Sequence, residues 1–281
     1  MNYLLRKAIK LYVLLPIGII VSFFKRDRRY ASILMYHRVN DNIKKELAVT
    51  TKNFEWQMDY LKKKNYNVIT LDTLIEKIKT KSVPKKCVVL TFDDGYEDYY
   101  HSAYKTLKRL EFPSIQYLVP GYIEKNKTFW WDRDIGESKL MNWEQINELS
   151  KSELVTFGAH TINHPDLDRL NNLEIHQELQ GSKKLLEAKL KKEIKHFCYP
   201  RGRYNTTSKQ IVRKTFESGV LMFNGKEINS KLNKDHLCVL KREPIQQSDG
   251  KLLFIARLNG WLCVEDNIKK IVYKMKDKAG A

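Results

Sequence analysis

The run Val88-Val89-Leu90-Thr91-Phe92, followed at once by Asp93-Asp94-Gly95, decides how this chain folds. Five apolar and β-branched residues predict a short buried strand. Two adjacent carboxylates come directly after it, and because like charges repel, a positive group should compensate them. The structural alternative makes Asp94-Gly95 a turn and Asp93 a helix cap. Functional residues gather at the carboxyl ends of strands in α/β folds, so these carboxylates are the first candidate site.

Similar strand-like runs recur along the chain, at Ser32–His37, Ile115–Val119 and Leu154–His160. Strand–helix alternation predicts a parallel sheet covered by helices, in either a barrel or an open sheet. No linker rich in Ser, Gly or Pro divides residues 31–281, which are therefore expected to form one domain. The helices between the strands are predicted from apolar residues at helical spacing: Phe54, Met58 and Leu61; Leu71, Leu74, Ile75 and Ile78; Tyr100, Ala103, Tyr104 and Leu107; Ile175, Leu179, Leu186 and Leu190.

Composition bounds the class of protein. The chain has 281 residues, 42% of them hydrophobic, which is enough for one large α/β domain and excludes a disordered chain. Its net charge of +18 points to an anionic partner such as nucleic acid, a membrane surface or a phosphorylated substrate. The four cysteines share no metal-type spacing and have apolar neighbours, which predicts reduced core thiols: Cys87, Cys198, Cys238 and Cys263.

Residues 11–24, LYVLLPIGIIVSFF, form the only long apolar run. Fourteen helical residues extend about 21 Å, short of a hydrocarbon core of about 30 Å. No small-residue cleavage site follows the run, and residues 1–30 hold seven Lys or Arg against one Asp. Residues 1–30 are therefore expected to form a helix at an anionic membrane, with the domain of residues 31–281 facing the cytoplasm at the inner membrane. A signal peptide, a short signal anchor and an ordinary buried helix are the alternatives.

A second polar cluster is Gly158-Ala159-His160-Thr161-Ile162-Asn163-His164-Pro165. On one helical turn, residues i and i+4 face the same side, so His160 and His164 would present both imidazoles to one metal. One carboxylate of the Asp pair would complete a three-ligand set with an open position, which suits a catalytic divalent metal such as zinc. The other carboxylate would serve as a general base. This combination predicts metal-assisted hydrolysis.

Thr-Phe-Asp-Asp-Gly followed by His-Thr-x-x-His-Pro resembles the polysaccharide deacetylases, the NodB-homology group or carbohydrate esterase family 4. The resemblance covers about residues 31–245. It implies a distorted (β/α)₇ barrel, here preceded by the short N-terminal membrane-associated helix, and removal of an N-acetyl group from an amino sugar. By position, Asp93 matches the family's base. Asp94, His160 and His164 match its metal ligands, with zinc as the expected metal.

Two further segments extend the resemblance. Leu34-Met35-Tyr36-His37 is similar to the Met-Tyr-His motif of a subgroup in which an early histidine is the general acid, so His37 is the candidate acid. As a structural alternative, His37 only makes hydrogen bonds at a strand end. Phe129-Trp130-Trp131-Asp132 is similar to a Trp-Trp-Asp segment of related deacetylases. It offers Trp131 as a candidate for sugar stacking, while core packing is the alternative.

Phe197-Cys198-Tyr199-Pro200-Arg201-Gly202 departs from the family's Arg-x-Pro-Tyr-Gly pattern. Cys198 stands where an arginine normally steadies the base, and Arg201 replaces a tyrosine. Arg242 resembles a late strand-end arginine and is the candidate replacement. The backbone N–H of Arg201 could stabilise an oxyanion, or its side chain could bind an anionic substrate group. Tyr199 is grouped with them on the substrate side.

The leading hypothesis is a membrane-associated, metal-dependent sugar N-deacetylase. Its substrate would be a growing polysaccharide or an N-acetyl sugar carried on polyprenyl phosphate, for lipid A, lipopolysaccharide or another surface glycan. A deformylase of a lipid-linked formamido sugar is an alternative with the same chemistry. A non-catalytic basic module and an inactive relative are also considered. Nucleic acid is not expected as a partner, because no nucleic-acid-binding signature accompanies the charge.

Overall fold

The computed structural model describes residues 3–23, 30–135, 138–222, 227–228, 234–262 and 265. Its main sheet has the strand order β10-β1-β5-β6-β7-β8-β9, with β11 paired to β1 and β4 paired to β5. All of these pairings are parallel except that of β10 with β1. The strands are β1 (Tyr30–Tyr36), β4 (Asn67–Val68), β5 (Cys87–Phe92), β6 (Ser114–Leu118), β7 (Val155–Ala159), β8 (His196–Cys198), β9 (Ser218–Val220), β10 (Glu227–Ile228) and β11 (Glu243–Pro244).

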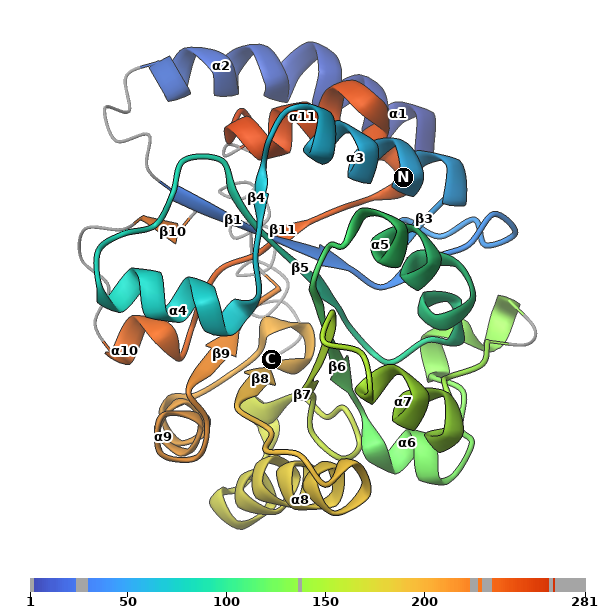
Figure 1. Cartoon of the computed structure of the whole chain (residues 1–281), viewed down its shortest axis with the longest axis vertical. Helices are drawn as coiled ribbons and strands as arrows, with labels where there is room; N and C mark the ends of the chain where they lie inside the picture. Colours follow the sequence, from blue (N-terminus) through green and yellow to red (C-terminus); the bar gives the residue numbers. More distant parts are fainter. Residues whose placement is uncertain are drawn as a thin grey trace.

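The sheet curls into a distorted barrel, which Figure 1 shows with its helices around the strands. Val220 at the end of β9 bridges to Leu240 in parallel. A few residues later β11 pairs with Leu34 and Met35 of β1, so the segment Leu240–Pro244 links the last strand of the sheet to the first. The predicted (β/α)₇ fold is confirmed, and the carboxyl ends of its strands meet at one end of the barrel.

Helices cover the outside of the barrel where the apolar stripes predicted them (Figure 1). Polar caps begin several of them: Thr50 accepts from the N–H of Asn53, and Asn171 and Glu174 form a reciprocal capping box. The helices are α3 (Thr51–Lys63), α4 (Leu71–Lys79), η2 with α5 (Tyr99–Leu110), α6 (Pro120–Glu124), η3 (Trp130–Ile135), α7 (Trp143–Ser150), η4 (Leu167–Arg169), α8 (Asn172–Leu190), η5 (Pro200–Gly202), α9 (Thr206–Thr215), α10 (Lys234–Leu237), η6 (Gln247–Asp249) and α11 (Gly250–Asn259). Outside the main sheet, β2 (Arg38–Val39) pairs with β3 (Ala48–Val49).

The N-terminal apolar run is helical. It comprises α1 (Tyr3–Ile9), the π-helical turn η1 (Lys10–Leu14) and α2 (Leu15–Phe23). The wide turn lies just before Pro16, which has no N–H to donate, and within it Leu15 N–H donates to the carbonyl of Lys10. Across the described part of the chain, no helix combines the length and apolar character needed to cross a bilayer. A division into residues 1–30 and 31–281 stays a prediction, and residues 24–29 lie outside the described residues.

Candidate functional site

The two adjacent carboxylates lie at the end of β5 and are almost fully buried. Asp93 continues the strand direction, and its N–H donates to the carbonyl of Tyr36 at 3.0 Å. Asp94 and Gly95 then take left-handed conformations, with φ of 73° and 76°. The chain therefore reverses between the two side chains, which have different neighbours. This geometry contains the turn expected at Asp94-Gly95. It is also compatible with a functional role for the two carboxylates.

The two histidines follow β7, but they do not lie on a helical turn as the spacing suggested. Thr161 and His164 both have left-handed backbones, with φ of 63° and 56°, so the segment is an irregular loop. Thr161 Oγ1 accepts from the N–H of His164 at 2.9 Å and holds the loop together. The rings of His160 and His164 still meet, with centroids 4.8 Å apart. The loop replaces the helix as the means of bringing both imidazoles to one place.

Asp94 and the two histidines form a three-ligand group. Asp94 Oδ1 lies 3.5 Å from His160 Nε2 and 3.6 Å from His164 Nε2. Ligand atoms around one tetrahedral zinc ion are separated by roughly 3.3–3.6 Å, given bond lengths of about 2.0–2.2 Å. Asp94 Oδ1 is buried without a hydrogen-bond partner among the described residues, and such an atom normally has one. These observations fit a divalent metal held by Asp94, His160 and His164.

The electrostatics agree with that fit. His160 Nδ1 lies 2.7 Å from the carbonyl of Cys198, which accepts from it and leaves Nε2 with its lone pair toward Asp94. Burial lowers the pKa of His160 to about 4 and also lowers the pKa of His164, so both rings are in the neutral form that binds metals. Burial, with the charges of Asp93 and Asp132, raises the pKa of Asp94 well above its usual range. A bound cation would relieve this unfavourable burial.

Asp93 is held by Arg242, as expected for the replacement of the missing family arginine. Arg242 Nη1 donates to Asp93 Oδ1 at 2.7 Å and Nη2 to Oδ2 at 2.6 Å. The guanidinium is fully buried and is fixed by further bonds to Thr91 Oγ1 and the carbonyl of Leu221. Burial alone would raise the pKa of Asp93, but the charge and hydrogen bonds of Arg242 outweigh it and hold that pKa well below its usual range. Asp93 is therefore an ionised carboxylate beside the Asp94-His160-His164 group.

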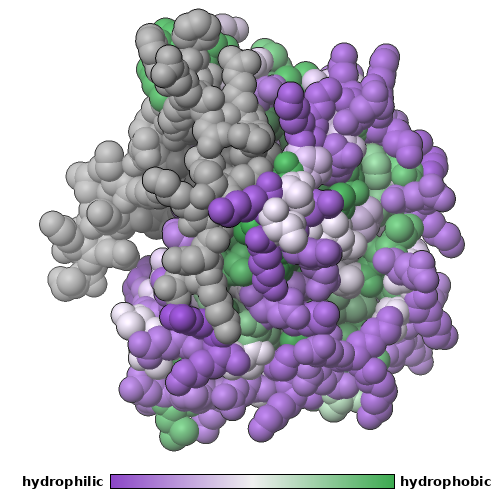
Figure 2. Space-filling model, turned by 60° about the vertical axis from the view of Figure 1, so that its left-hand side comes forward, coloured by the Kyte–Doolittle hydropathy of each residue, from purple (hydrophilic) through white to green (hydrophobic). Residues whose placement is uncertain are grey.

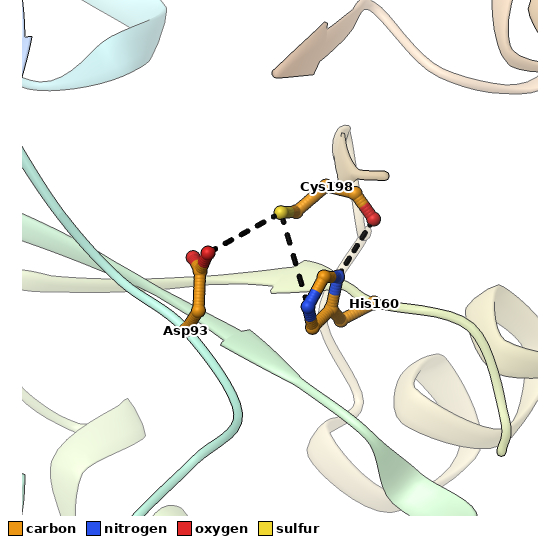
Figure 3. Close-up of side chains that lie close together, drawn as sticks. All are labelled: Asp93, His160 and Cys198. Atoms are coloured by element: carbon orange, nitrogen blue, oxygen red, sulfur yellow. Dashed lines mark hydrogen bonds between the residues drawn. The ribbon is translucent and has the colours of Figure 1, made fainter. Parts of the chain in front are cut away.

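Cys198 belongs to the site and is not just the core thiol that its neighbours suggested. Its Sγ lies 3.6 Å from Asp93 Oδ2 and 4.0 Å from His160 Nε2 (Figure 3), and it accepts from Arg242 Nη2 at 3.1 Å. Cys198 thus lies against Asp93, and Arg242, just before β11, reaches the same carboxylate. Asp93, His160 and Cys198 also form a compact ligand-type group. Because Arg242 engages both oxygens of Asp93, the group containing Asp94 is the better candidate to hold a metal.

His37 directly follows β1 and lies near Asp93. Its Nε2 is 4.0 Å from Asp93 Oδ2, and its side chain keeps 13% of its accessible surface. Burial lowers the pKa of His37, although Asp93 opposes this shift. Its Nδ1 finds no hydrogen-bond partner within the described ranges. The structural alternative, in which His37 only makes hydrogen bonds at the strand end, is therefore not supported at Nδ1.

The aromatic loop divides its two tryptophans between different roles. Trp131 is half-buried, stacks on Phe129 at 4.4 Å between centroids and lies 4.9 Å from the ring of His164. Trp131 Nε1 donates to Tyr96 Oη at 3.1 Å, so this ring packs inward and lies against His164. Trp130 is 58% exposed and is the ring that offers a free surface. Sugar stacking by Trp131 stays a prediction, and Trp130 presents the more exposed of the two rings.

The Tyr199–Arg201 segment holds two of the predicted substrate-side residues in different surroundings. Tyr199 is fully buried, and its backbone N–H donates to the carbonyl of Val220, so its place on the substrate side stays a prediction. Arg201 has a left-handed backbone with φ of 53° and pairs with Asp166. Its guanidinium carbon lies 5.8 Å from the ring centre of Trp130 and 5.6 Å from that of Trp131.

Asp132 is a member of the site that sequence reasoning missed. It is buried, accepts from Tyr96 Oη at 2.6 Å and from Ser138 Oγ at 3.0 Å, and lies 3.8 Å from Lys45 Nζ. Its charge contributes to the raised pKa of Asp94. The available signal was the position of Asp132 directly after Trp130 and Trp131, in a segment whose prediction concerned only the aromatic rings.

This site, with a metal-type Asp-His-His group beside an arginine-clamped carboxylate at the end of a parallel barrel, has the residues of a hydrolase active site. Residues 80–216 match the sequence profile of the polysaccharide deacetylase family. The chain belongs to that family. The N-terminal Met-Tyr-His subgroup is not tested by this match.

Individual relatives agree with the family. The chain is 31% identical over 190 residues to YxkH of Bacillus subtilis, whose name describes it as a polysaccharide deacetylase. It is 26% identical over 178 residues to a poly-β-1,6-N-acetyl-D-glucosamine N-deacetylase of Staphylococcus aureus. These alignments cover 67% and 60% of this chain, and 63% and 59% of the relatives' length. The solved structure of the deacetylase PplD of Streptococcus pyogenes, in complex with acetate, superposes with a TM-score of 0.70 at 25% identity, over 82% of this chain and 98% of that one.

Proposed function

We propose that this protein is a metal-dependent hydrolase that removes the N-acetyl group from an amino sugar of a surface glycan. The observation that carries the proposal is the Asp94-His160-His164 group with the clamped carboxylate of Asp93 beside it. The name of the Staphylococcus aureus relative supports the N-acetylglucosamine type of substrate. The chain spans about three fifths of the length of that relative, so deacetylase activity on such a sugar is a proposal for this chain.

Each residue has a defined part in amide hydrolysis. A divalent metal, expected to be zinc, supplies Lewis acidity toward the carbonyl oxygen and the attacking water when bound. Asp93 accepts the proton of that water as its oxygen adds to the carbonyl carbon, and its low pKa keeps it ionised for this task. His37 donates a proton to the sugar nitrogen as the C–N bond breaks, which releases acetate and a free amine. The N–H of Arg201 stabilises the developing oxyanion.

The finer substrate proposal is an N-acetyl sugar on a polyprenyl phosphate carrier. Trp130 offers an exposed ring for one sugar face, and Arg201 places a cation 5.8 Å from it, which suits a sugar with a phosphate nearby. The basic N-terminal segment supports a location at the inner membrane, with the catalytic domain on the cytoplasmic side, where a carrier lipid would be presented.

The test is release of acetate from an N-acetylated glucosamine oligomer or its lipid-linked monomer. We expect turnover in the wild type with zinc, loss of turnover with a chelator, and loss of both zinc content and turnover in His164→Ala. His176→Ala, an exposed histidine on α8, is the matched control and should keep both. Matched N-formyl substrates decide the alternative, because a deformylase would release formate faster than acetate. Wild-type turnover by metal-free His164→Ala would exclude the proposed ligand set.

A further inference from the structure

The inward side of the N-terminal helical segment is anchored by a buried lysine. Lys10 keeps 4% of its accessible surface although it directly precedes the apolar run. Its Nζ lies 2.8 Å from Asp249 Oδ1 and donates to Ser248 Oγ at 2.7 Å and to Gln246 Oε1 at 2.6 Å. A charge buried in this way is stable only while these partners surround it. The lysine therefore ties the segment to η6 of the catalytic domain.

Leu14 and Gly18, four and eight residues after Lys10, also pack against the domain. Gly18 lies so close to Trp261 that a Cβ at residue 18 would be 1.6 Å from the Trp261 carbonyl oxygen. Between Lys10 and Gly18, Leu14 is buried in a cluster with Leu253 and Ala256 of α11. Residues 10, 14 and 18 thus form one inward stripe at i, i+4 and i+8. The helical segment is packed as part of the domain.

The outward side is apolar and exposed. Tyr12 keeps 80% of its accessible surface, Val13 48%, Ile17 44% and Ile20 61%, and the last three lie at i, i+4 and i+7. Figure 2 shows hydrophobic atoms at the top of the molecule, the level at which Figure 1 places α1 and α2 beside α11. Single exposed apolar residues are ordinary, but a continuous stripe of them marks an interaction surface. We call these four residues the apolar stripe.

Charge decides which partner suits the apolar stripe. The sequence between α2 and β1 contains Lys25, Arg26, Arg28 and Arg29, and the whole chain carries +18. A second copy of this chain would bring the same positive charge and be repelled, whereas anionic lipid head groups attract it. A spanning orientation would pull Lys10 out of its cluster of partners. A helix lying in the plane of the interface keeps that cluster and immerses only the outward side, to a depth of about 5–10 Å.

We propose that the segment Tyr3–Phe23 is a built-in part of the domain that lies flat in an anionic membrane, with Tyr12, Val13, Ile17 and Ile20 among the acyl chains. This inference is independent of the catalytic chemistry, since none of these residues belongs to the candidate site. It differs from a flexible tether, because the membrane would then bind one fixed face of the barrel. It also differs from a removable leader, because Lys10 and Gly18 are part of the domain's packing.

The test compares vesicle binding by the full-length protein and a triple variant, Val13→Asn with Ile17→Asn and Ile20→Asn. Cosedimentation is measured with vesicles of phosphatidylglycerol and phosphatidylcholine, with phosphatidylcholine alone, and at low and high salt. The wild type should prefer the anionic vesicles and keep part of its binding at high salt, because apolar insertion is not screened. The triple variant should bind roughly tenfold or more weakly, with no salt-resistant part. Leu173→Asn, a 67%-exposed leucine on α8, is the matched control.

Two results would overturn the proposal. One is equal vesicle binding by the wild type and the triple variant. The other is a change from dimer to monomer in the triple variant, measured by light scattering, without a change in vesicle binding, which would assign the apolar stripe to a second copy. Acetate release in solution should be the same in all three proteins. A failure of the membrane proposal is therefore distinguishable from a failure of the proposed deacetylase activity.

Discussion

Arg242 supplies a buried positive charge beside Asp93. The motif that this chain resembles implies an arginine at position 198, where the sequence has a cysteine. Arg242 reaches the same carboxylate with two hydrogen bonds of 2.6 and 2.7 Å, and its Nη2 also donates to the sulfur of Cys198. Asp93 therefore has a buried positive charge beside it, and that charge comes from a residue 149 positions further along the chain.

Arg242→Lys should change the pH profile of the proposed reaction. The guanidinium lowers the pKa of Asp93, so a single ammonium that cannot bind both oxygens should let that pKa rise toward its usual range. The base is active when ionised, and the acid limb of kcat/KM should therefore move to higher pH. We expect kcat to fall by roughly 10-fold to 10²-fold, in the range of general-base effects.

The same measurement on Arg109→Lys provides the control, since Arg109 forms an exposed pair with Asp59 at 2.8 Å. Its pH profile should match the wild type. Arg242→Met would be a harsher variant, because an uncompensated buried carboxylate costs about 3–5 kcal/mol of stability. An acid limb that stays in place in Arg242→Lys would show that Arg242 does not set the ionisation of the base.

The elements of the fold differ in how far their own sequence determines them. β5 was predictable because all six of its residues are buried, which produces an unbroken apolar run. The four predicted strands lie within two residues of their predicted bounds. The order of motifs also predicted that Asp94, His160 and His164 would meet. These features follow from local pattern together with the geometry of parallel strands.

The features that were not predictable depend on contacts between distant residues. The histidine loop has left-handed residues because α8 holds it in place: Glu178 Oε2 accepts from the N–H groups of Ile162 and Asn163 at 2.8 and 2.9 Å. Spacing alone suggested a helical turn at this position. In the same way, the neighbours of Cys198 in the sequence are apolar, while its neighbours in space include Asp93. Local sequence carries no signal for either fact.

Gly18→Ala should detach or loosen the N-terminal helical segment. In an unconstrained helix, replacing glycine by alanine stabilises by about 1 kcal/mol. Here the new Cβ would lie 1.6 Å from the carbonyl oxygen of Trp261, so the backbone of one segment has to move. We expect a lower midpoint of thermal unfolding and faster proteolytic cleavage within residues 3–23. Ile20→Ala, at an exposed position of the same helix, should change neither, and a stabilised Gly18→Ala would contradict the packed position of α2.

At the scale of the whole molecule, the candidate site joins parts of the barrel that are far apart in the sequence. Asp93 and Asp94 follow β5, the two histidines follow β7, His37 follows β1, and Arg242 precedes β11. Without a metal, this arrangement buries Asp94 against the charges of Asp93 and Asp132. A cation at this point therefore has consequences for the stability of the entire fold, because it compensates charge at the meeting point of several strands.

Zinc should stabilise the folded protein, and more strongly at higher pH. The pKa of Asp94 is raised in the metal-free fold, so ionisation of this carboxylate destabilises that fold as pH rises through the raised value, and a proton competes with zinc below it. His160, with a pKa of about 4, competes for protons only at acidic pH. Free zinc at a hundred times its dissociation constant should add about 2.7 kcal/mol to the free energy of unfolding. The thermal midpoint should rise with zinc in the wild type and in His176→Ala, and the rise should shrink as pH is lowered. An equal rise in His164→Ala would place the zinc elsewhere, since that variant lacks one of the three ligands.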